Sequence, residues 1–184
     1  MNRRIFLNFG LAPALMAAPW TKLFDGVTLA GWVKEGNANF RVQEGVITVD
    51  QGAYSWLRTE KAYTNYELEV EFKTAADGNS GIFLRSAAQG KPHETGYELQ
   101  IFAAHPDYPT GGIVGHVRGE KSARFRPNEW NRYHVRHDGK RLVVKLNGKR
   151  VLDFTDDKSA SGHLGLQFNP NKPISFRKIR VREL

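Results

Sequence analysis

From residue 40 onward, apolar and polar residues alternate with a period of two, which is typical of β-strands whose two faces meet different surroundings. The clearest case is residues 67–74 (ELEVEFKT), where Leu68, Val70 and Phe72 share one face and charged residues share the other. Glycine, proline and asparagine separate these segments, as they do in close turns. The pattern therefore predicts a series of short antiparallel strands.

The last third of the chain is predicted to form successive hairpins. Asp138-Gly139 and Asn147-Gly148 lie between strand-like segments and supply the positive φ angles that tight hairpin turns require. In residues 174–184 the apolar positions change parity, which predicts a β-bulge near Arg177-Lys178. Because no long amphipathic helix is indicated, we expect a single all-β domain, built as a two-sheet antiparallel sandwich.

Residues 1–18 (MNRRIFLNFGLAPALMAA) have the pattern of an export signal. Arg3 and Arg4 precede a modest apolar stretch and resemble the twin-arginine signal of bacterial proteins. That stretch is too short for a stable membrane span. We expect export, to a bacterial periplasm, and a mature domain over residues 20–184.

Composition narrows the functional classes. The chain of 184 residues has no cysteine, which excludes disulfides and thiolate chemistry. Its net charge of +8 is scattered over predicted strands and loops, without a basic helix or a nucleic-acid-binding motif, so nucleic acid is not an expected partner. His134 and His137 fall on opposite strand faces, and histidine spacing gives no argument for a metal site.

The segment GYELQIF, residues 96–102, places unusual groups together on its outward face. If Tyr97, Leu99 and Ile101 face the core, the outward residues are Glu98, Gln100 and Phe102. A carboxylate beside an amide and an aromatic ring suits carbohydrate recognition, because sugar C–H faces pack on rings and hydroxyl groups need fixed polar partners. The pattern alone is equally compatible with an ordinary solvated face.

Neighbouring segments repeat this arrangement. GIFLRS (81–86) and LGLQFN (164–169) have outward polar or aromatic side chains, and RLVVKL (141–146) has an outward lysine. The outward residues are Phe83, Arg85, Lys145, Gln167 and Asn169. A separate row of Glu67, Glu69 and Glu71 could serve glycoside hydrolysis, which uses two carboxyl groups, or could be a solvated face balanced by bases.

The order of motifs along the chain resembles the 3-keto-disaccharide hydrolase domain family. The motifs that carry the resemblance are LFDGVTLAGW (23–32), NSGIFLR (79–85), GYELQI (96–101), HPD (105–107), TGGIVG (110–115), EWN (129–131), LNG (146–148), GHLGLQ (162–167) and FRKIRVREL (176–184). The resemblance implies a jelly-roll sandwich of the concanavalin A-like lectin/glucanase type. It also implies cleavage of glycosides that carry a ketone at sugar carbon 3, by proton abstraction at carbon 2, β-elimination and hydration.

The resemblance assigns candidate roles by position. Glu98 is the expected base or acid, and Arg85 and Lys145 are the expected stabilisers of the enolate. Gln100, Gln167 and Asn169 would bind sugar hydroxyl groups. The remaining candidate substrate-binding residues are His105, Asp107 and Trp130. No cofactor is required, although a divalent metal is compatible with this chemistry.

The chain departs from many relatives after the GYELQI strand, where Ala103 stands near the position of an aspartate, and at Asn169, where many have a histidine. The alternative is therefore a glycan-binding module that uses the same face without catalysis. In both cases the expected partner is a carbohydrate. The sequence does not indicate an oligomeric state.

Overall fold

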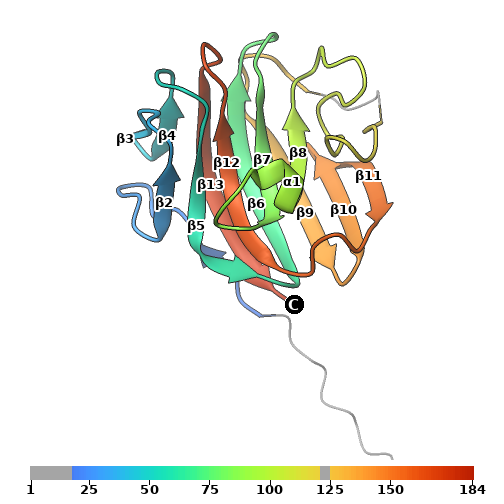
Figure 1. The fold of residues 1–184 in the computed structure, drawn as a ribbon. Helices are drawn as coiled ribbons and strands as arrows, with labels where there is room; N and C mark the ends of the chain where they lie inside the picture. Colours follow the sequence, from blue (N-terminus) through green and yellow to red (C-terminus); the bar gives the residue numbers. More distant parts are fainter. Residues whose placement is uncertain (1–17, 121–124) are drawn as a thin grey trace, which may run out of the picture.

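The computed structural model describes residues 18–120 and 125–184, which form two antiparallel β-sheets packed face to face, with the smaller sheet in front in Figure 1. The larger sheet consists of β1 (Thr21–Lys22), β3 (Arg41–Gln43), β4 (Val46–Val49), β6 (Tyr66–Thr74), β9 (Asn131–Asp138), β10 (Arg141–Leu146), β11 (Lys149–Thr155) and β13 (Ile174–Glu183). The smaller sheet consists of β2 (Trp32–Glu35), β5 (Ser55–Tyr63), β7 (Ser80–Ser86), β8 (Tyr97–Ile101) and β12 (Gly162–Phe168). The predicted all-β sandwich is confirmed.

The strands follow an order in space that differs from their order in the chain. The larger sheet runs β11-β10-β9-β6-β13-β4-β3, with β1 paired to β13, and the smaller sheet runs β2-β5-β12-β7-β8. The one short helix of the described residues, α1 (Pro92–Thr95), connects β7 to β8 (Figure 1). Among those residues, no helix is long and apolar enough to cross a membrane. The export signal expected at residues 1–18 lies almost entirely outside the described part of the chain and stays a prediction.

Alternation along the strands creates the core between the sheets. In β6, Leu68, Val70 and Phe72 are buried, and in β8 the same holds for Tyr97 and Leu99. The alternate residues of each strand point away from the core, so each sheet keeps an outer face whose side chains are free to differ in chemistry.

The predicted turn and bulge chemistry is also observed. Asn147 and Gly148 both have positive φ, as expected for the tight turn between β10 and β11. The pairing of β13 with β6 shifts register between Arg177 and Arg180, and Lys178 has a φ of 49°. This bulge lets Phe176 and Ile179 both reach the core.

Arg85, at the end of β7, joins several loops at one end of the sandwich. Its Nε donates to the Thr64 carbonyl oxygen at 2.8 Å, and its Nη1 donates to the carbonyl oxygens of Gly139 at 2.7 Å and Ser159 at 3.0 Å. Arg85 is only 1% exposed, so its charge is satisfied mainly by these carbonyl groups. The guanidinium therefore holds chain segments that are far apart in the sequence.

We predict that Arg85→Met lowers the free energy of unfolding by about 3 kcal/mol, because buried carbonyl oxygens lose charged donors and gain no substitute. Arg126→Met is the matched control, since the Arg126 side chain is 57% exposed and its removal should cost less than about 0.5 kcal/mol. Urea unfolding of both variants measures the difference. Equal effects of the two substitutions would contradict a structural role for Arg85.

Candidate functional site

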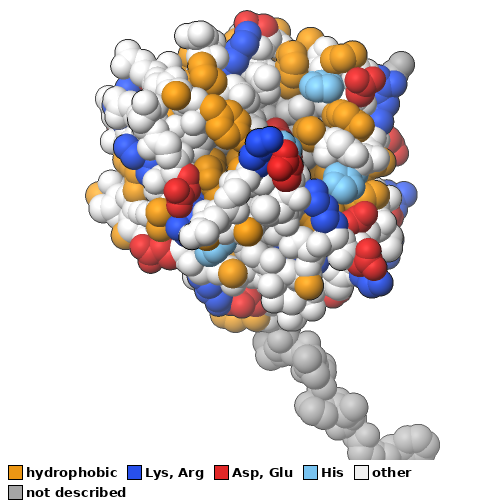
Figure 2. Space-filling model, in the orientation of Figure 1, with side chains coloured by type: hydrophobic (Ala, Val, Ile, Leu, Met, Phe, Trp, Pro, Cys, Tyr) orange, Lys and Arg blue, Asp and Glu red, His pale blue; other side chains and the backbone are white. Residues whose placement is uncertain are grey.

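The outer face of the smaller sheet carries a row of residues that lie next to one another because of the pairing register of β5, β12, β7 and β8. Arg58 on β5 lies opposite Gly165 on β12, Gly165 lies opposite Phe83 on β7, and Phe83 lies opposite Glu98 on β8. In the view of Figure 2, which faces this sheet, hydrophobic side chains are spread over the face, and a basic and an acidic side chain lie side by side near its centre. Register thus places an aromatic residue, Phe83, directly across from Glu98.

Two glycines provide the space that this arrangement needs. A Cβ atom on Gly165 would lie 2.4 Å from Cε3 of Trp56, and one on Gly81 would lie 2.9 Å from Cγ and Oε1 of Glu98. Real Cβ atoms do not approach other atoms so closely, so neither position tolerates a larger residue without movement of its neighbour. The absent side chain of Gly81 lets Glu98 lean across β7 toward β12.

Over β12 the Glu98 carboxyl group contacts the Gln167 amide, and further amide side chains fix the orientation of these two groups. Gln167 Nε2 donates to Glu98 Oε1 at 2.8 Å, and Asn169 Nδ2 donates to Gln167 Oε1 at 2.8 Å. Asn169 Nδ2 also lies 3.3 Å from Asn79 Oδ1. Because an amide nitrogen only donates and an amide oxygen only accepts, this chain directs the Gln167 nitrogen toward the carboxyl group.

The surroundings make the Glu98 carboxyl group an unusually weak acid. Its side chain is almost fully buried, and burial raises the pKa of Glu98 to about 7, while the hydrogen bond from Gln167 opposes the increase. Burial disfavours the charged form, and a single neutral donor does not compensate. A carboxyl group with this pKa can accept or donate a proton at neutral pH.

Gln100 shares the outward face of β8 with Glu98 and is 4% exposed. Its Oε1 accepts from the backbone N–H of Ile101 at 3.2 Å. The segment 111–114 pairs with the open edge of β8, through bonds such as Gln100 N–H to the Gly112 carbonyl oxygen at 2.9 Å. This segment protects the edge of the strand that carries Glu98 and Gln100.

The structure therefore brings together four of the predicted site residues, Glu98, Gln100, Gln167 and Asn169. Sequence reasoning overlooked residues of β5 and the residue before it. Tyr54, Trp56 and Arg58 alternate in the sequence AYSWLR, and this period-two signal could have placed them on the outward face. The Tyr54 hydroxyl interacts with the Gln167 side chain. Arg58 pairs with Glu35 at 2.8 Å.

The prediction that Arg85 joins Glu98 is wrong. Arg85 has a φ of 52°, which interrupts the alternation of β7, and its side chain turns to the carbonyl groups at the end of the sandwich. The pairing between β12 and β7 also shifts register between His163 and Gly165. A regular strand would have placed Arg85 beside Phe83 on the outer face, and this local irregularity prevents it.

The structure also separates Lys145 and Trp130 from Glu98. Lys145 lies on β10 of the larger sheet, where it pairs across the strands with His134, and its side chain points away from the core. Trp130 precedes β9 of the same sheet, and the Arg177 guanidinium covers its ring at 4.0 Å from the centroid. Both predictions of a place near Glu98 are therefore wrong, because the two residues belong to the opposite sheet.

His105 and Asp107 lie in the loop after β8, as expected. His105 Nδ1 accepts from the backbone N–H groups of Asp107 at 3.2 Å and Tyr108 at 3.0 Å, which orders this turn. Among residues 18–120 and 125–184, neither side chain is hydrogen-bonded to Glu98. Their role in substrate binding stays a prediction.

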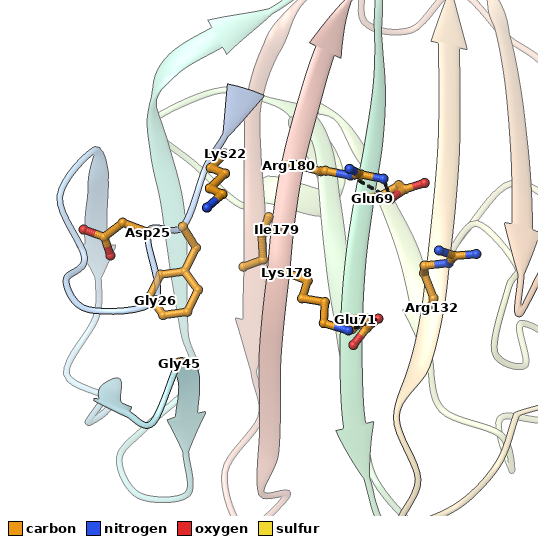
Figure 3. Close-up of a pocket in the computed structure, with 11 residues that line it drawn as sticks. Lys22, Asp25, Gly26, Gly45, Glu69, Glu71, Arg132, Lys178, Ile179 and Arg180 are labelled. Atoms are coloured by element: carbon orange, nitrogen blue, oxygen red, sulfur yellow. Dashed lines mark hydrogen bonds and ion pairs between the residues drawn. The ribbon is translucent and has the colours of Figure 1, made fainter. Parts of the chain in front are cut away.

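A cavity of about 410 Å³ lies on the outer face of the larger sheet (Figure 3). Glu69 and Glu71 line it, but each is ion-paired: Glu69 with Arg180 at 2.6 Å, and Glu71 with Arg177 at 2.7 Å. Although burial alone would raise the pKa of Glu71, hydrogen bonds from Arg177 and Lys178 bring it below its ordinary value. These contacts do not favour the glycosidase alternative, since a glycosidase needs a general acid with a raised pKa, whereas the pKa of Glu71 is lowered.

Within residues 18–120 and 125–184, no group of three or more histidine or acidic side chains is arranged to hold a metal ion. Around Glu98 the available oxygen donors are amides and one carboxyl group that already accepts from Gln167. This set does not match the several oxygen ligands that a divalent cation prefers.

The sequence comparisons agree with this fold and with the motifs. The model of the 3-keto-alpha-glucoside-1,2-lyase-like domain matches residues 19–182. The chain belongs to this family. The match confirms the family resemblance seen in the motifs and includes all the strands that carry the amides around Glu98. A comparison with curated protein sequences found no match.

Solved structures share the architecture. Two proteins of Parabacteroides distasonis that carry a provisional glycosyl hydrolase assignment are 23% and 24% identical to this chain, with TM-scores of 0.77 and 0.76. The alignments cover 90% of this chain in both cases, and 94% and 100% of the other chains. The carbohydrate-binding module CBM66 of Bacillus subtilis is 16% identical, with a TM-score of 0.65 over 83% of this chain and 96% of the module. At these identities the similarity establishes the shared fold.

The raised pKa of Glu98 predicts a specific dependence of stability on pH. Its folded-state pKa of about 7 lies above the ordinary value of 4.5, so between these two values the folded state binds more protons than the unfolded state. The contribution of Glu98 to the free energy of unfolding should therefore fall as pH rises from about 4.5 to about 7, by about 3 kcal/mol in all.

Urea unfolding at pH 5 and pH 8 checks this prediction by comparing the protein with Glu98→Gln. The glutamine variant keeps an oxygen acceptor for Gln167 but cannot ionise, and the difference between the two proteins cancels the effect of other titrating groups. The unsubstituted protein should lose more stability between the two pH values than Glu98→Gln does. Parallel pH dependences would contradict a raised pKa.

Proposed function

We propose that this protein is carbohydrate-active and cleaves glycosides oxidised to a ketone at sugar carbon 3. The observation that carries the proposal is the buried Glu98 carboxyl group, oriented by Gln167 and able to exchange a proton near pH 7. Membership of the 3-keto-alpha-glucoside-1,2-lyase-like family supports the choice of substrate class. Together they favour proton-transfer chemistry at a sugar ketone.

The reaction follows from the acidity of the proton on carbon 2, which is increased by the neighbouring ketone. Ionised Glu98 removes this proton, and the electrons of the C–H bond pass into an enolate. The enolate then re-forms the ketone and expels the group on carbon 1, which leaves a double bond between carbons 1 and 2. If water then adds to that double bond, the overall reaction is a hydrolysis. If water does not add, the reaction ends at the unsaturated sugar and the protein is a lyase.

The surrounding residues suit the binding of a sugar ring. Gln167, Asn169 and Gln100 supply amide donors and acceptors of the kind that sugar hydroxyl groups require. Trp56 and Phe83 pack edge to face, with ring centroids 5.4 Å apart, and give the face an apolar support. This support also keeps water from the carboxyl group, which maintains its raised pKa.

The second candidate function is glycan binding without catalysis. Two observations favour it: Arg85 and Lys145 do not reach the face of Glu98, and the fold is shared with the carbohydrate-binding module CBM66. A binding module would use the amides and the aromatic support but would need no proton transfer. Measured affinity for a glycan without cleavage of any 3-keto-glycoside would favour this function.

We also propose that residues 1–18 direct export to a bacterial periplasm. Replacing Arg3 and Arg4 together by lysine should retain the protein in the cytoplasm, because twin-arginine signals require the paired arginines. Fractionation of bacterial cells that express the full chain measures the distribution. Unchanged export of the double variant would contradict a twin-arginine signal.

The proposed chemistry is tested by incubating the protein with 3-keto-glucosides and following release of the group on carbon 1. Glu98→Gln should lower the rate by at least about 100-fold, since a neutral amide cannot accept the proton. Glu69→Gln is the matched control, because Glu69 lies on the opposite sheet and should leave the rate unchanged. Turnover that is unaffected by Glu98→Gln would exclude Glu98 as the base.

A further inference from the structure

Tyr54 lies immediately before β5, at the border of the face that carries Glu98. Ser55 pairs with Phe168, so the preceding residue, Tyr54, lies beside Asn169, and alternation places Tyr54 and Trp56 on the same outward side. Tyr54 is 42% exposed, whereas Trp56 is 4% exposed. The tyrosine ring is therefore accessible to a ligand that rests on this face.

The loop that holds Tyr54 is anchored to its surroundings. The backbone N–H of Ala53 donates to Asn37 Oδ1 at 2.8 Å, and Ser55 Oγ accepts from the backbone N–H of Ala38 at 3.0 Å. Gly52 packs so closely on Ala38 that a Cβ atom would lie 2.4 Å from its Cα. These contacts fix the position from which the Tyr54 side chain reaches the site.

The hydroxyl group of Tyr54 lies near the amide that orients the proposed base. This hydroxyl group interacts with the Gln167 side chain, the same amide that donates to Glu98. Burial raises the pKa of Tyr54, and the negative charge of Glu98 raises it further. The phenol therefore keeps its proton at neutral pH and can act as a donor.

The proposed elimination requires a donor of this kind. Glu98 removes the proton on carbon 2, and the oxygen that leaves carbon 1 must gain a proton unless it belongs to a very acidic alcohol. The amides of Gln167 and Gln100 do not release protons, and the Arg58 guanidinium is paired with Glu35. Tyr54 is a neighbouring group with a transferable proton.

We propose that Tyr54 is the general acid of this site and transfers its phenolic proton to the leaving-group oxygen on carbon 1. This inference rests on the proposed function. The C2–H and C1–O bonds break, the double bond between carbons 1 and 2 forms, and the leaving group departs as a neutral alcohol. Glu98 then holds the former C2 proton, and transfer of a proton from Glu98 to the Tyr54 phenolate restores both groups without any further reactant.

Electrostatic coupling between the two groups assists this sequence. Before reaction, the ionised Glu98 carboxylate holds the pKa of Tyr54 up. Once Glu98 accepts the C2 proton, its charge disappears and the phenol becomes a stronger acid at the time when the leaving oxygen develops negative charge. After release, the lower pKa of Glu98, about 7, favours return of its proton to the phenolate.

The test compares Tyr54→Phe with the unsubstituted protein on two 3-keto-glucosides that differ only in the leaving group. A methyl glycoside releases a poorly acidic alcohol, and a 4-nitrophenyl glycoside releases an acidic phenol that can depart as an anion. We expect Tyr54→Phe to lower kcat/KM by about 100-fold or more for the methyl glycoside and by less than about 5-fold for the 4-nitrophenyl glycoside. Tyr63→Phe, at the other end of β5, is the control and should change neither rate.

Other outcomes overturn the inference or separate it from the proposed function. Equal losses of kcat/KM on both substrates would show that Tyr54 supports the enolate or holds the sugar. Unchanged kcat/KM on both substrates would show that Tyr54 is dispensable. Each of these results overturns general acid catalysis by Tyr54. A melting temperature close to that of the unsubstituted protein confirms that the variant is folded. If the unsubstituted protein cleaves neither substrate, the proposed function itself fails, and this inference with it.

Discussion

Desolvation of one carboxyl group determines the chemistry of this molecule. Transfer of an ionised carboxylate from water into a protein interior is costly unless opposite charges or several donors compensate, and Glu98 has one neutral amide donor in Gln167. The remaining imbalance is the reason why the pKa of Glu98 rises to about 7. The packed rings of Trp56 and Phe83 stand on the same outer face, and Phe83 lies directly across from Glu98.

The two outer faces of the sandwich show how the same residue type acquires opposite properties. On the larger sheet, arginines of β13 lie directly across from the glutamates of β6: Arg182 from Glu67 and Arg180 from Glu69. Although burial alone would raise the pKa of Glu67, hydrogen bonds from Arg182 and Arg136 bring it below its ordinary value. On the smaller sheet, no arginine lies opposite Glu98, whose cross-strand partner is Phe83. A row of three glutamates is therefore a poorer acid–base site than one glutamate opposite a phenylalanine.

The parts of this structure that the sequence predicted are those that depend on local periodicity. Alternation identified the strands, the outward set around Glu98 and the parity change that became the bulge at Lys178. Arg85 was misplaced because a single positive φ in an otherwise regular segment reverses the direction of the side chain without any signal in the pattern. Lys145 and Trp130 were misplaced for another reason: alternation gives the face of a strand, but membership of a sheet depends on long-range pairing.

The site also shows how a backbone position can set the acidity of a side chain on the next strand. Without a Cβ on Gly81, the Glu98 side chain can cross β7 and meet Gln167 on β12, whereas a larger residue would push the carboxyl group away from this contact. A displaced carboxyl group would regain water and with it an ordinary pKa. Gly81 of NSGIFLR and Gly165 of GHLGLQ therefore make room for the side chains of Glu98 and Trp56, although neither glycine carries a functional group. A motif of this kind is recognisable only when the three strands β8, β7 and β12 are seen side by side.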